Sequence, residues 1–81
     1  MRVRVRLFAS LREATGLTET VLDLETGASA EDAWRKLAER FPGLSARRAS
    51  LAAAVNRRYA KFDAVLADGD EIGFIPPVSG G

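Results

Sequence analysis

The chain closes on Glu71-Ile72-Gly73-Phe74-Ile75-Pro76-Pro77-Val78-Ser79-Gly80-Gly81, in which a short apolar strand leads directly into a tail. Strand alternation puts Ile72 and Phe74 on one face and Gly73 and Ile75 on the other. Two prolines then stiffen the exit from the fold, and two glycines without side chains follow near the end. We therefore predict that the residues after Ile75 project from the domain and present the terminal carboxylate.

Three earlier stretches are predicted to be strands, at residues 2–8, 18–24 and 51–55, with shorter partner segments at 59–62 and 64–66. The second is expected to run antiparallel to the first, because only a short helical connection separates them. The pattern leaves the direction of the third strand relative to the closing strand open. In the first strand Phe8 shares a face with Arg2, Arg4 and Arg6, where alternation predicts solvent.

One long helix is predicted after Ser29, with Asp32 placed for a capping box and Pro42 as its stop. Its apolar side chains form a single stripe, which consists of Trp34, Leu37, Ala38 and Phe41. A shorter helix at about 10–15 has Ser10 as its expected N-cap, and the segment after Pro42 is interpreted as a basic connection. Laying the long helix across one face of a mixed sheet buries both apolar surfaces. The predicted fold class is α+β, one domain over residues 1–81 with four to five strands.

The composition excludes several kinds of function. The 81 residues have a net charge of +1 and contain neither Cys nor His. Disulfides, thiolate nucleophiles, a histidine base and most zinc sites are therefore ruled out, and we expect no metal site. The small net charge gives no strong field toward nucleic acid or an anionic membrane. No signal peptide or membrane-spanning run is visible, so we expect a cytoplasmic protein without nucleic-acid or membrane partners.

Two charged clusters have both a functional and a structural interpretation. The first is acidic and consists of Asp68, Asp70 and Glu71; it lacks the full calcium-loop pattern, so a turn with solvated charges is favoured. The second is the stripe of Arg2, Arg4 and Arg6, which could contact phosphates but is more often the solvated face of a half-buried strand. Neither cluster supplies catalytic machinery.

The terminal glycines also have two interpretations. With glycine at about 7% of residues, a terminal pair arises by chance about once in 200 chains, and it could be a remnant of cloning. However, a glycine backbone can enter a channel too narrow for any Cβ atom. A carboxylate on such a stalk can reach another protein's active site, provided that it is first activated, most simply as an acyl-adenylate made from ATP.

Three apolar side chains support a docking function for the same end of the molecule. Phe8 lies on the arginine face of the first strand, and Ile75 lies opposite the core-facing residues of the closing strand. These two side chains could meet on the outer face of the sheet, joined by Tyr59. A cluster beside a projecting tail indicates a docking surface; the alternative, that loops cover one or two of them, stays open.

Over essentially its whole length the chain resembles the small subunits of molybdopterin synthases, a branch of the ubiquitin-like sulfur-carrier group. The likeness lies in Leu7-Phe8-Ala9 with Leu11-Arg12-Glu13, in Leu51-Ala52-Ala53-Ala54-Val55-Asn56, in Asp68-Gly69-Asp70-Glu71-Ile72 and in Phe74 to Gly81. A Gly-Gly end is common to all ubiquitin-like carriers, whereas the Pro-Pro-Val-Ser-Gly-Gly ending is more specific to the molybdopterin branch. The resemblance implies the β-grasp, or ubiquitin-like, fold.

The resemblance also implies a function in molybdenum cofactor biosynthesis. Gly81 would be adenylated by a ubiquitin-activating-type adenylyltransferase, which consumes ATP, and then converted to a thiocarboxylate. The tail, Pro76, Pro77, Val78, Ser79 and Gly80, would enter the large subunit, which holds the catalytic residues, and donate sulfur there to the pterin precursor (precursor Z). The chain would thus be a non-catalytic sulfur-donor subunit that binds no cofactor.

The family's docking patch maps onto Phe8, Tyr59 and Ile75, although the last two positions are often Leu and Phe in the family. Its assemblies are usually heterotetramers. Other functions remain open at this point: a sulfur carrier for thiamine or tRNA thiolation, a ubiquitin-like modifier conjugated to lysines, or a binding module that uses the arginine face on nucleic acid.

Overall fold

The protein is described by a computed structural model that covers residues 1–77. Its elements in chain order are β1 (Arg2–Leu7), α1 (Ala9–Thr15), β2 (Glu19–Asp23), α2 (Ala30–Arg40), the 3₁₀ helix η1 (Pro42–Ser50), β3 (Ala52–Val55), β4 (Arg58–Ala60) and β5 (Glu71–Ile75). The predicted tail positions Val78, Ser79, Gly80 and Gly81 lie outside the described residues.

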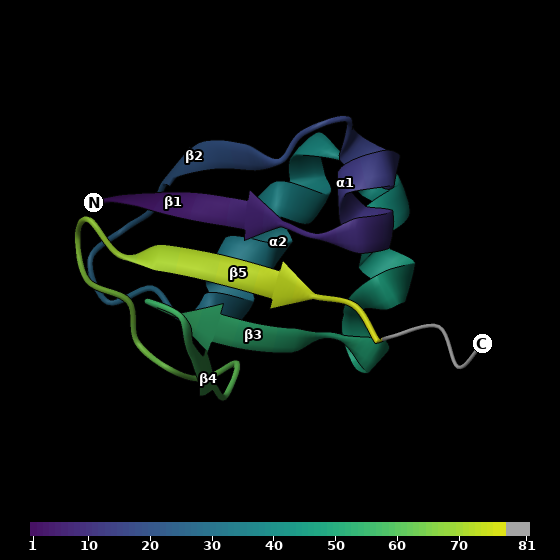
Figure 1. The fold of residues 1–81 in the computed structure, drawn as a ribbon. Helices are drawn as coiled ribbons and strands as arrows, with labels where there is room; N and C mark the ends of the chain where they lie inside the picture. Colours follow the sequence, from purple (N-terminus) through teal and green to yellow (C-terminus); the bar gives the residue numbers. More distant parts are fainter. Residues whose placement is uncertain (78–81) are drawn as a thin grey trace.

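The strands form one mixed sheet in the order β2-β1-β5-β3-β4 (Figure 1). The closing strand β5 lies at the centre, where it pairs parallel with β1 and antiparallel with β3. The two outer pairs, β1 with β2 and β3 with β4, are antiparallel. The predicted mixed sheet with one main helix across it is therefore confirmed, with five strands in the described residues. The structure also answers the open question, since β3 runs antiparallel to β5.

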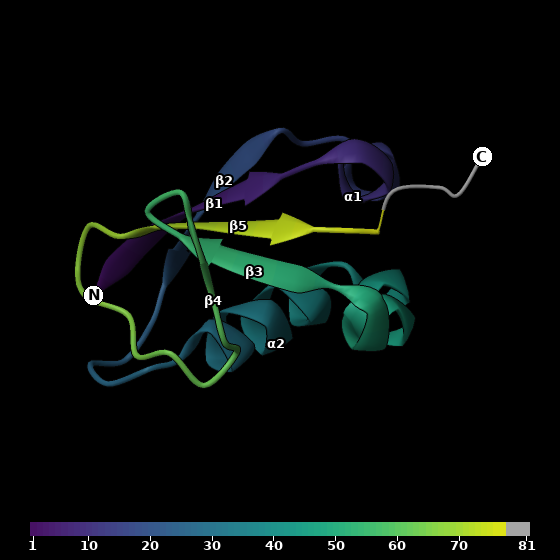
Figure 2. The ribbon, with the colours of Figure 1, turned by 60° about the horizontal axis from the view of Figure 1, so that its bottom comes forward.

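The hydrophobic core lies between one face of the sheet and α2, and Figure 2 shows the two as separate layers. The inward side chains of β1 and β5 meet the apolar stripe of α2, which the sequence predicted. The largest contacts are aromatic: the ring of Trp34 packs edge-on against Phe74 with centroids 5.0 Å apart, and Phe62 stacks on the same Phe74 at 6.1 Å. Such pairs contribute beyond the area they bury.

The main helix begins and ends where the sequence indicates. The Ser29 side chain accepts a hydrogen bond from the Asp32 amide, and the Asp32 carboxylate accepts one from the Ser29 amide, so the predicted capping box is confirmed. The Ser29 amide and hydroxyl both donate to the ionised carboxylate, and these two bonds hold the pKa of Asp32 below its ordinary value. The helix ends at Arg40, just before Pro42. Within residues 1–77, no helix has the length and apolar content required to cross a membrane.

The short helix α1 departs from its prediction. It begins at Ala9, one residue early, with Phe8 as N-cap and no side-chain capping bond, so the expected cap at Ser10 is wrong. Leu11 is fully buried. Burial of a leucine side chain stabilises the fold by about 1.5–3 kcal/mol, more than the roughly 1 kcal/mol from an N-cap, so it decides where the helix starts. Its predicted end is confirmed, because Gly16 adopts the left-handed conformation with φ of 75°.

The segment expected to be a plain connection forms η1, because Leu44 is buried and Pro42 is well suited to a helix start. Near its end the guanidinium of Arg48 donates to both carboxylate oxygens of Glu31 at 2.7–3.0 Å. The same group lies 3.3 Å from the ring centroid of Phe62. Arg48 thus ties η1 to α2 and to the segment after β4, and its hydrogen bonds lower the pKa of Glu31.

The Glu31–Arg48 pair gives the fold a predicted acid dependence. Since the pKa of Glu31 is lower in the folded state than its ordinary value of 4.5, the pair stabilises the fold above that value, and this stability is lost as pH falls through the folded-state pKa. We expect Glu31→Gln to lower the free energy of unfolding by about 0.5–1 kcal/mol at neutral pH, with the difference vanishing in acid. Urea unfolding at a series of pH values measures it.

The matched control is Glu39→Gln, an exposed glutamate on the same helix that has no ion pair within residues 1–77. It should change the free energy of unfolding by less than about 0.5 kcal/mol at any of these pH values. Equal effects of the two substitutions across the pH series would contradict the assignment.

Candidate functional site

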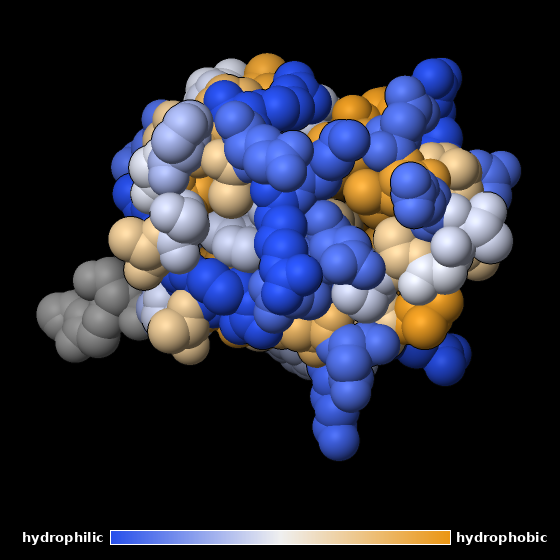
Figure 3. Space-filling model, turned by 180° about the vertical axis from the view of Figure 1, so that it is seen from behind, coloured by the Kyte–Doolittle hydropathy of each residue, from blue (hydrophilic) through white to orange (hydrophobic). Residues whose placement is uncertain are grey.

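The two faces of the sheet have different surroundings. Helix α2 lies behind one face in Figure 1, and none of the described helices covers the other, which we call the outer face. The helix-covered side, seen in Figure 3, is hydrophilic over its middle with smaller apolar patches around it. This is the ordinary surface of an amphipathic helix, so the outer face is the better place to look for a functional site.

One cross-strand row explains the shape of the outer face. Pairing places Arg6 beside Gly73, Gly73 beside Ala54, and Ala54 beside Tyr59, so the row crosses β1, β5, β3 and β4 in turn. Its two central members have the smallest side chains, while its outer members are long. The result is a depression of about 470 Å³, lined by Arg6, Phe8, Ala54, Arg57, Tyr59, Glu71, Gly73 and Ile75.

All three residues predicted to form a docking patch line this depression. Tyr59 is 79% exposed and Phe8 36% exposed, whereas Ile75 is half-buried at the end of β5. Phe8 reaches the site because the backbone stays extended beyond β1 before α1 begins. The structure therefore brings the three together; their function in docking remains a prediction.

The ring of Phe8 lies against the backbone of Gly73. A Cβ atom added at Gly73 would be 3.1 Å from Cε2 of Phe8, closer than ordinary van der Waals contact. Glycine in the interior of a strand often marks such a close approach, and this is the sequence signal that could have identified the contact. The centroid of the same ring is 5.5 Å from the guanidinium carbon of Arg6, within the range of a cation–π interaction.

Glu71 is not the solvated charge that the sequence predicted. It is 8% exposed on the outer face, with one carboxylate oxygen 3.9 Å from Nη1 of Arg6 and the other 3.5 Å from Nε of Arg57. The interpretation failed because the sequence cannot show that β1 lies beside β5, which brings Arg6 within reach. Arg6, Arg57 and Glu71 are thus members of the site that sequence reasoning missed.

The rest of the acidic cluster has structural functions. Asp68 accepts a hydrogen bond from the Arg2 amide at 2.7 Å. Asp70 accepts one from the Ala67 amide at 2.8 Å and another from the Asn56 side chain at 3.0 Å. These bonds close the turn before β5. Residues 1–77 contain no group of three or more acidic, histidine or cysteine side chains able to hold a metal ion.

The other arginines of the first strand have acidic neighbours. Arg2 donates from Nε to Asp23 at 2.9 Å, and Nη1 of Arg4 is 4.0 Å from Glu19. The Arg2 hydrogen bond lowers the pKa of Asp23 and is matched by a raised pKa of Arg2. This part of the stripe is the solvated, ion-paired face that the sequence analysis favoured.

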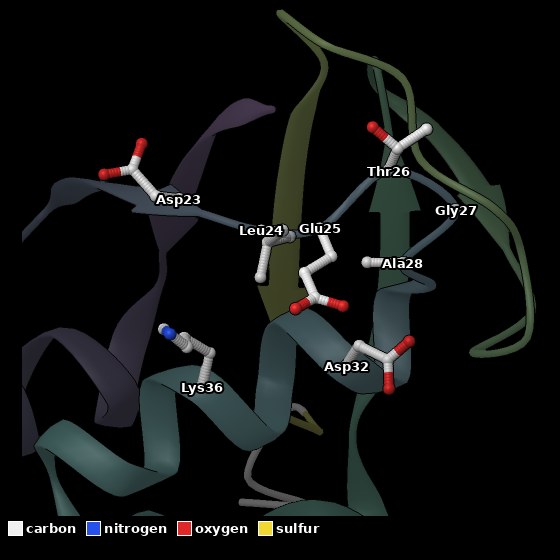
Figure 4. Close-up of a pocket in the computed structure, with 8 residues that line it drawn as sticks. All are labelled: Asp23, Leu24, Glu25, Thr26, Gly27, Ala28, Asp32 and Lys36. Atoms are coloured by element: carbon white, nitrogen blue, oxygen red, sulfur yellow. The ribbon is translucent and has the colours of Figure 1, made fainter.

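A larger depression, of about 650 Å³, lies elsewhere, between the β2–α2 connection and the first turns of α2. In Figure 4 Glu25 points toward α2, while Asp23 and Asp32 point away from each other. Asp23 is paired with Arg2 and Asp32 is held in the capping box. The charged groups do not converge on one point, so this depression does not form a chemical site.

The outer-face depression adjoins the exit of the tail. Strand β5 ends with Ile75 on the depression, and the two residues that follow are Pro76, half-buried, and Pro77, exposed. The chain thus leaves the sheet beside Phe8 and Ile75 and toward the end where α1 lies (Figure 1). A protein that binds the outer face would be well placed to receive the residues after Pro77.

Comparison with known proteins gives consistent likenesses. The model of the ThiS family matches residues 5–81. The molybdopterin synthase sulfur carrier subunit of Arabidopsis thaliana is 33% identical over 81 residues, which cover all of this chain and 84% of the relative.

Solved structures agree. The crystal structure of small archaeal modifier protein 1 from Haloferax volcanii superposes with a TM-score of 0.91 at 29% identity, with both chains fully covered. A complex of subunits 1 and 2 of molybdopterin-converting factor from Helicobacter pylori contains a chain that matches with a TM-score of 0.70 at 26% identity, again covering both chains completely. These neighbours confirm the β-grasp fold.

The Phe8–Gly73 contact can be tested directly. We expect Gly73→Ala to shift the Phe8 ring by a few tenths of an ångström, because the new methyl group would lie only 3.1 Å from its Cε2 atom. The free energy of unfolding should change by less than about 1 kcal/mol, since the strand propensity of alanine offsets the crowding. NMR chemical shifts of the Phe8 ring and urea unfolding measure the two effects.

The control is Gly43→Ala, where an added Cβ would meet nothing within 4 Å. Unmoved Phe8 signals in both variants would refute the contact.

Proposed function

The chain belongs to the ThiS family and, within it, to the molybdopterin synthase sulfur carrier subunits, and we propose that it carries sulfur on its C-terminal carboxylate in molybdenum cofactor biosynthesis. The observation that supports this most directly is the position of the exit. Strand β5 ends on the only predicted docking patch and directs the chain away from the sheet there.

The residue types of the chain fit a carrier. The chain has no Cys or His, and the carboxylates of Asp68, Asp70 and Glu71 are engaged in hydrogen bonds or ion pairs. A free carboxylate is a poor electrophile, so it must be activated before sulfur can attack its carbon. In the proposed cycle an adenylyltransferase joins the Gly81 carboxylate to AMP and releases pyrophosphate from ATP. Sulfide-level sulfur then attacks the acyl carbon, the C–S bond forms as the bond to AMP breaks, and the thiocarboxylate remains.

We infer further that the pterin precursor, which accepts the sulfur, is bound by a large catalytic subunit. The solved complex from Helicobacter pylori pairs subunit 1 with subunit 2 of its molybdopterin-converting factor. By analogy, the patch of Phe8, Tyr59 and Ile75 would bind the large subunit while the tail enters its active site and delivers sulfur to the pterin precursor. A heterotetramer in the cytoplasm, with one carrier at each end, is the assembly we propose.

The modification itself gives the central test. Intact-mass measurement of the chain, co-expressed with its activating enzyme, should show one oxygen replaced by sulfur, and fragmentation should locate the change at Gly81. Deletion of Gly81, or extension by one residue, should abolish sulfur transfer, because either change moves the carboxylate.

The circular dichroism of both tail variants should match that of the unchanged chain, because the core lies within residues 3–74. An unmodified mass in the presence of the activating enzyme and a sulfur source would contradict the proposed function.

The docking patch predicts a graded loss of binding. Alanine substitution of Phe8 or Ile75 should weaken binding to the large subunit by about 1–3 kcal/mol, since apolar side chains at the centre of an interface contribute most of its binding energy. Val65→Ala is a matched control: Val65 is apolar and 69% exposed but does not line the depression. Calorimetric titration measures all three, and equal losses would argue against the patch.

A second function is favoured by a specific likeness, that to small archaeal modifier protein 1. A modifier would use the same adenylated terminus but would form an amide bond with a lysine of another protein. The two functions are distinguished by the products in cells: a conjugate ladder that depends on Gly81 indicates a modifier, and a stable complex with a large subunit indicates the carrier.

A further inference from the structure

We propose that Arg6 and Arg57 form a cationic rim on the docking patch, which selects a large subunit that carries carboxylates opposite them. This inference rests on the proposed function and adds the chemistry of the partner surface. The two residues come from distant parts of the chain, Arg6 from β1 and Arg57 from the β3–β4 turn, and both line the depression with Phe8 and Tyr59.

The edge of the docking patch has a local excess of positive charge. Arg2 is matched by its own carboxylate at 2.9 Å, whereas Arg6 and Arg57 share the single carboxylate of Glu71. Two guanidinium groups and one carboxylate leave one unbalanced positive charge at the edge of the apolar patch. A complementary partner surface is therefore negative there.

The geometry of the shared carboxylate also bears on the two arginines. The distances from Glu71, 3.9 Å to Arg6 and 3.5 Å to Arg57, are longer than charge-assisted hydrogen bonds. Glu71 therefore holds the two side chains near the patch without using their donors, five on each guanidinium. Arg57 has 80% of its side chain exposed and Arg6 42%. A partner that docks here shields these guanidinium groups from solvent and must supply hydrogen-bond acceptors in its place. A neutral apolar partner would leave the buried charges unpaired.

The backbone is strained at Arg57. Asn56 and Arg57 both have positive φ, 51° and 70°, as the two central positions of a tight hairpin turn require. Asn-Gly is the sequence that this turn favours, because glycine adopts the left-handed conformation freely. Arginine at this position strains the turn, which agrees with a use of its side chain in docking.

The strain makes the proposal testable through two effects of opposite sign. Arg57→Gly should raise the urea midpoint of the carrier, because it relieves the turn, and should weaken binding to the large subunit about 3- to 10-fold at low salt. Arg57→Gln should weaken binding equally without raising the midpoint. A residue that served only the fold would change both properties in the same direction.

The control is Arg58→Gln, which makes the same charge change one residue along. Arg58 precedes Tyr59 on β4, so its side chain lies on the opposite face of the strand, and it does not line the depression. Its binding should stay within about twofold of the unchanged chain. Stopped-flow association of the full carrier with its large subunit, from about 50 to 500 mM NaCl, should show the Arg57 loss mainly in the association rate and a flatter salt dependence.

Rescue completes the test. Arg57→Glu should bind worse than Arg57→Gln, and reversing one carboxylate of the large subunit to lysine should restore its binding. If Arg57→Gln binds like Arg58→Gln with an unchanged salt dependence, or if no reversal on the large subunit rescues Arg57→Glu, the inference is wrong, although Gly81 could still acquire sulfur.

Two further outcomes would also overturn the inference. If the unchanged chain does not bind a large subunit at all, the proposed function fails together with it. If the Arg57 substitutions affect binding to duplex DNA but not to the large subunit, the rim serves nucleic acid instead.

Discussion

The pairing of β5 with both β1 and β3 is the constraint on which the other features depend. It places a strand from the end of the chain at the centre of the sheet, beside the strand from the beginning. That arrangement buries Ile72 and Phe74 beneath α2 and brings Gly73 under the ring of Phe8 on the other face. The core and the outer-face depression are thus two sides of one strand, and the exit of the tail is its end.

Local signals predicted the elements but not how they meet. Alternation and helical spacing identified the five strands and α2, because each signal is contained in a few neighbouring residues. The segment expected at 64–66 is not a strand and forms only an isolated bridge between Val65 and Ser29. The same capping pattern was right at Ser29 and wrong at Ser10, because burial of Leu11 decided where α1 starts. The neighbours of the closing strand could not be chosen from pattern, since its partners lie 67 positions away on β1 and 17 to 23 positions away on β3.

The site shows the same division. Phe8, Tyr59 and Ile75 were recognisable as apolar residues out of place, which is information that the alternating pattern carries by itself. Glu71 was misjudged, because its burial depends on Arg6 from β1 and on Arg57 from the β3–β4 turn. A charge next to a turn is solvated in most proteins; here two guanidinium groups cover it. The burial of Glu71 follows only from the pairing of β5 with its two neighbouring strands.

Three departures from local preference lie on the outer face. A glycine occupies the middle of the central strand, an arginine occupies a left-handed turn position, and an aromatic side chain is 79% exposed on β4. Each choice disfavours the isolated fold, and all three line one depression. In the core, the cap at Ser29, the apolar stripe of α2 and the aromatic packing agree with one another. Helix α1 is the exception, since its expected cap is absent and Ala9 has a positive φ of 48°. Proteins break local rules mainly at functional sites, so the position of these three residues agrees with the docking function proposed for the outer face.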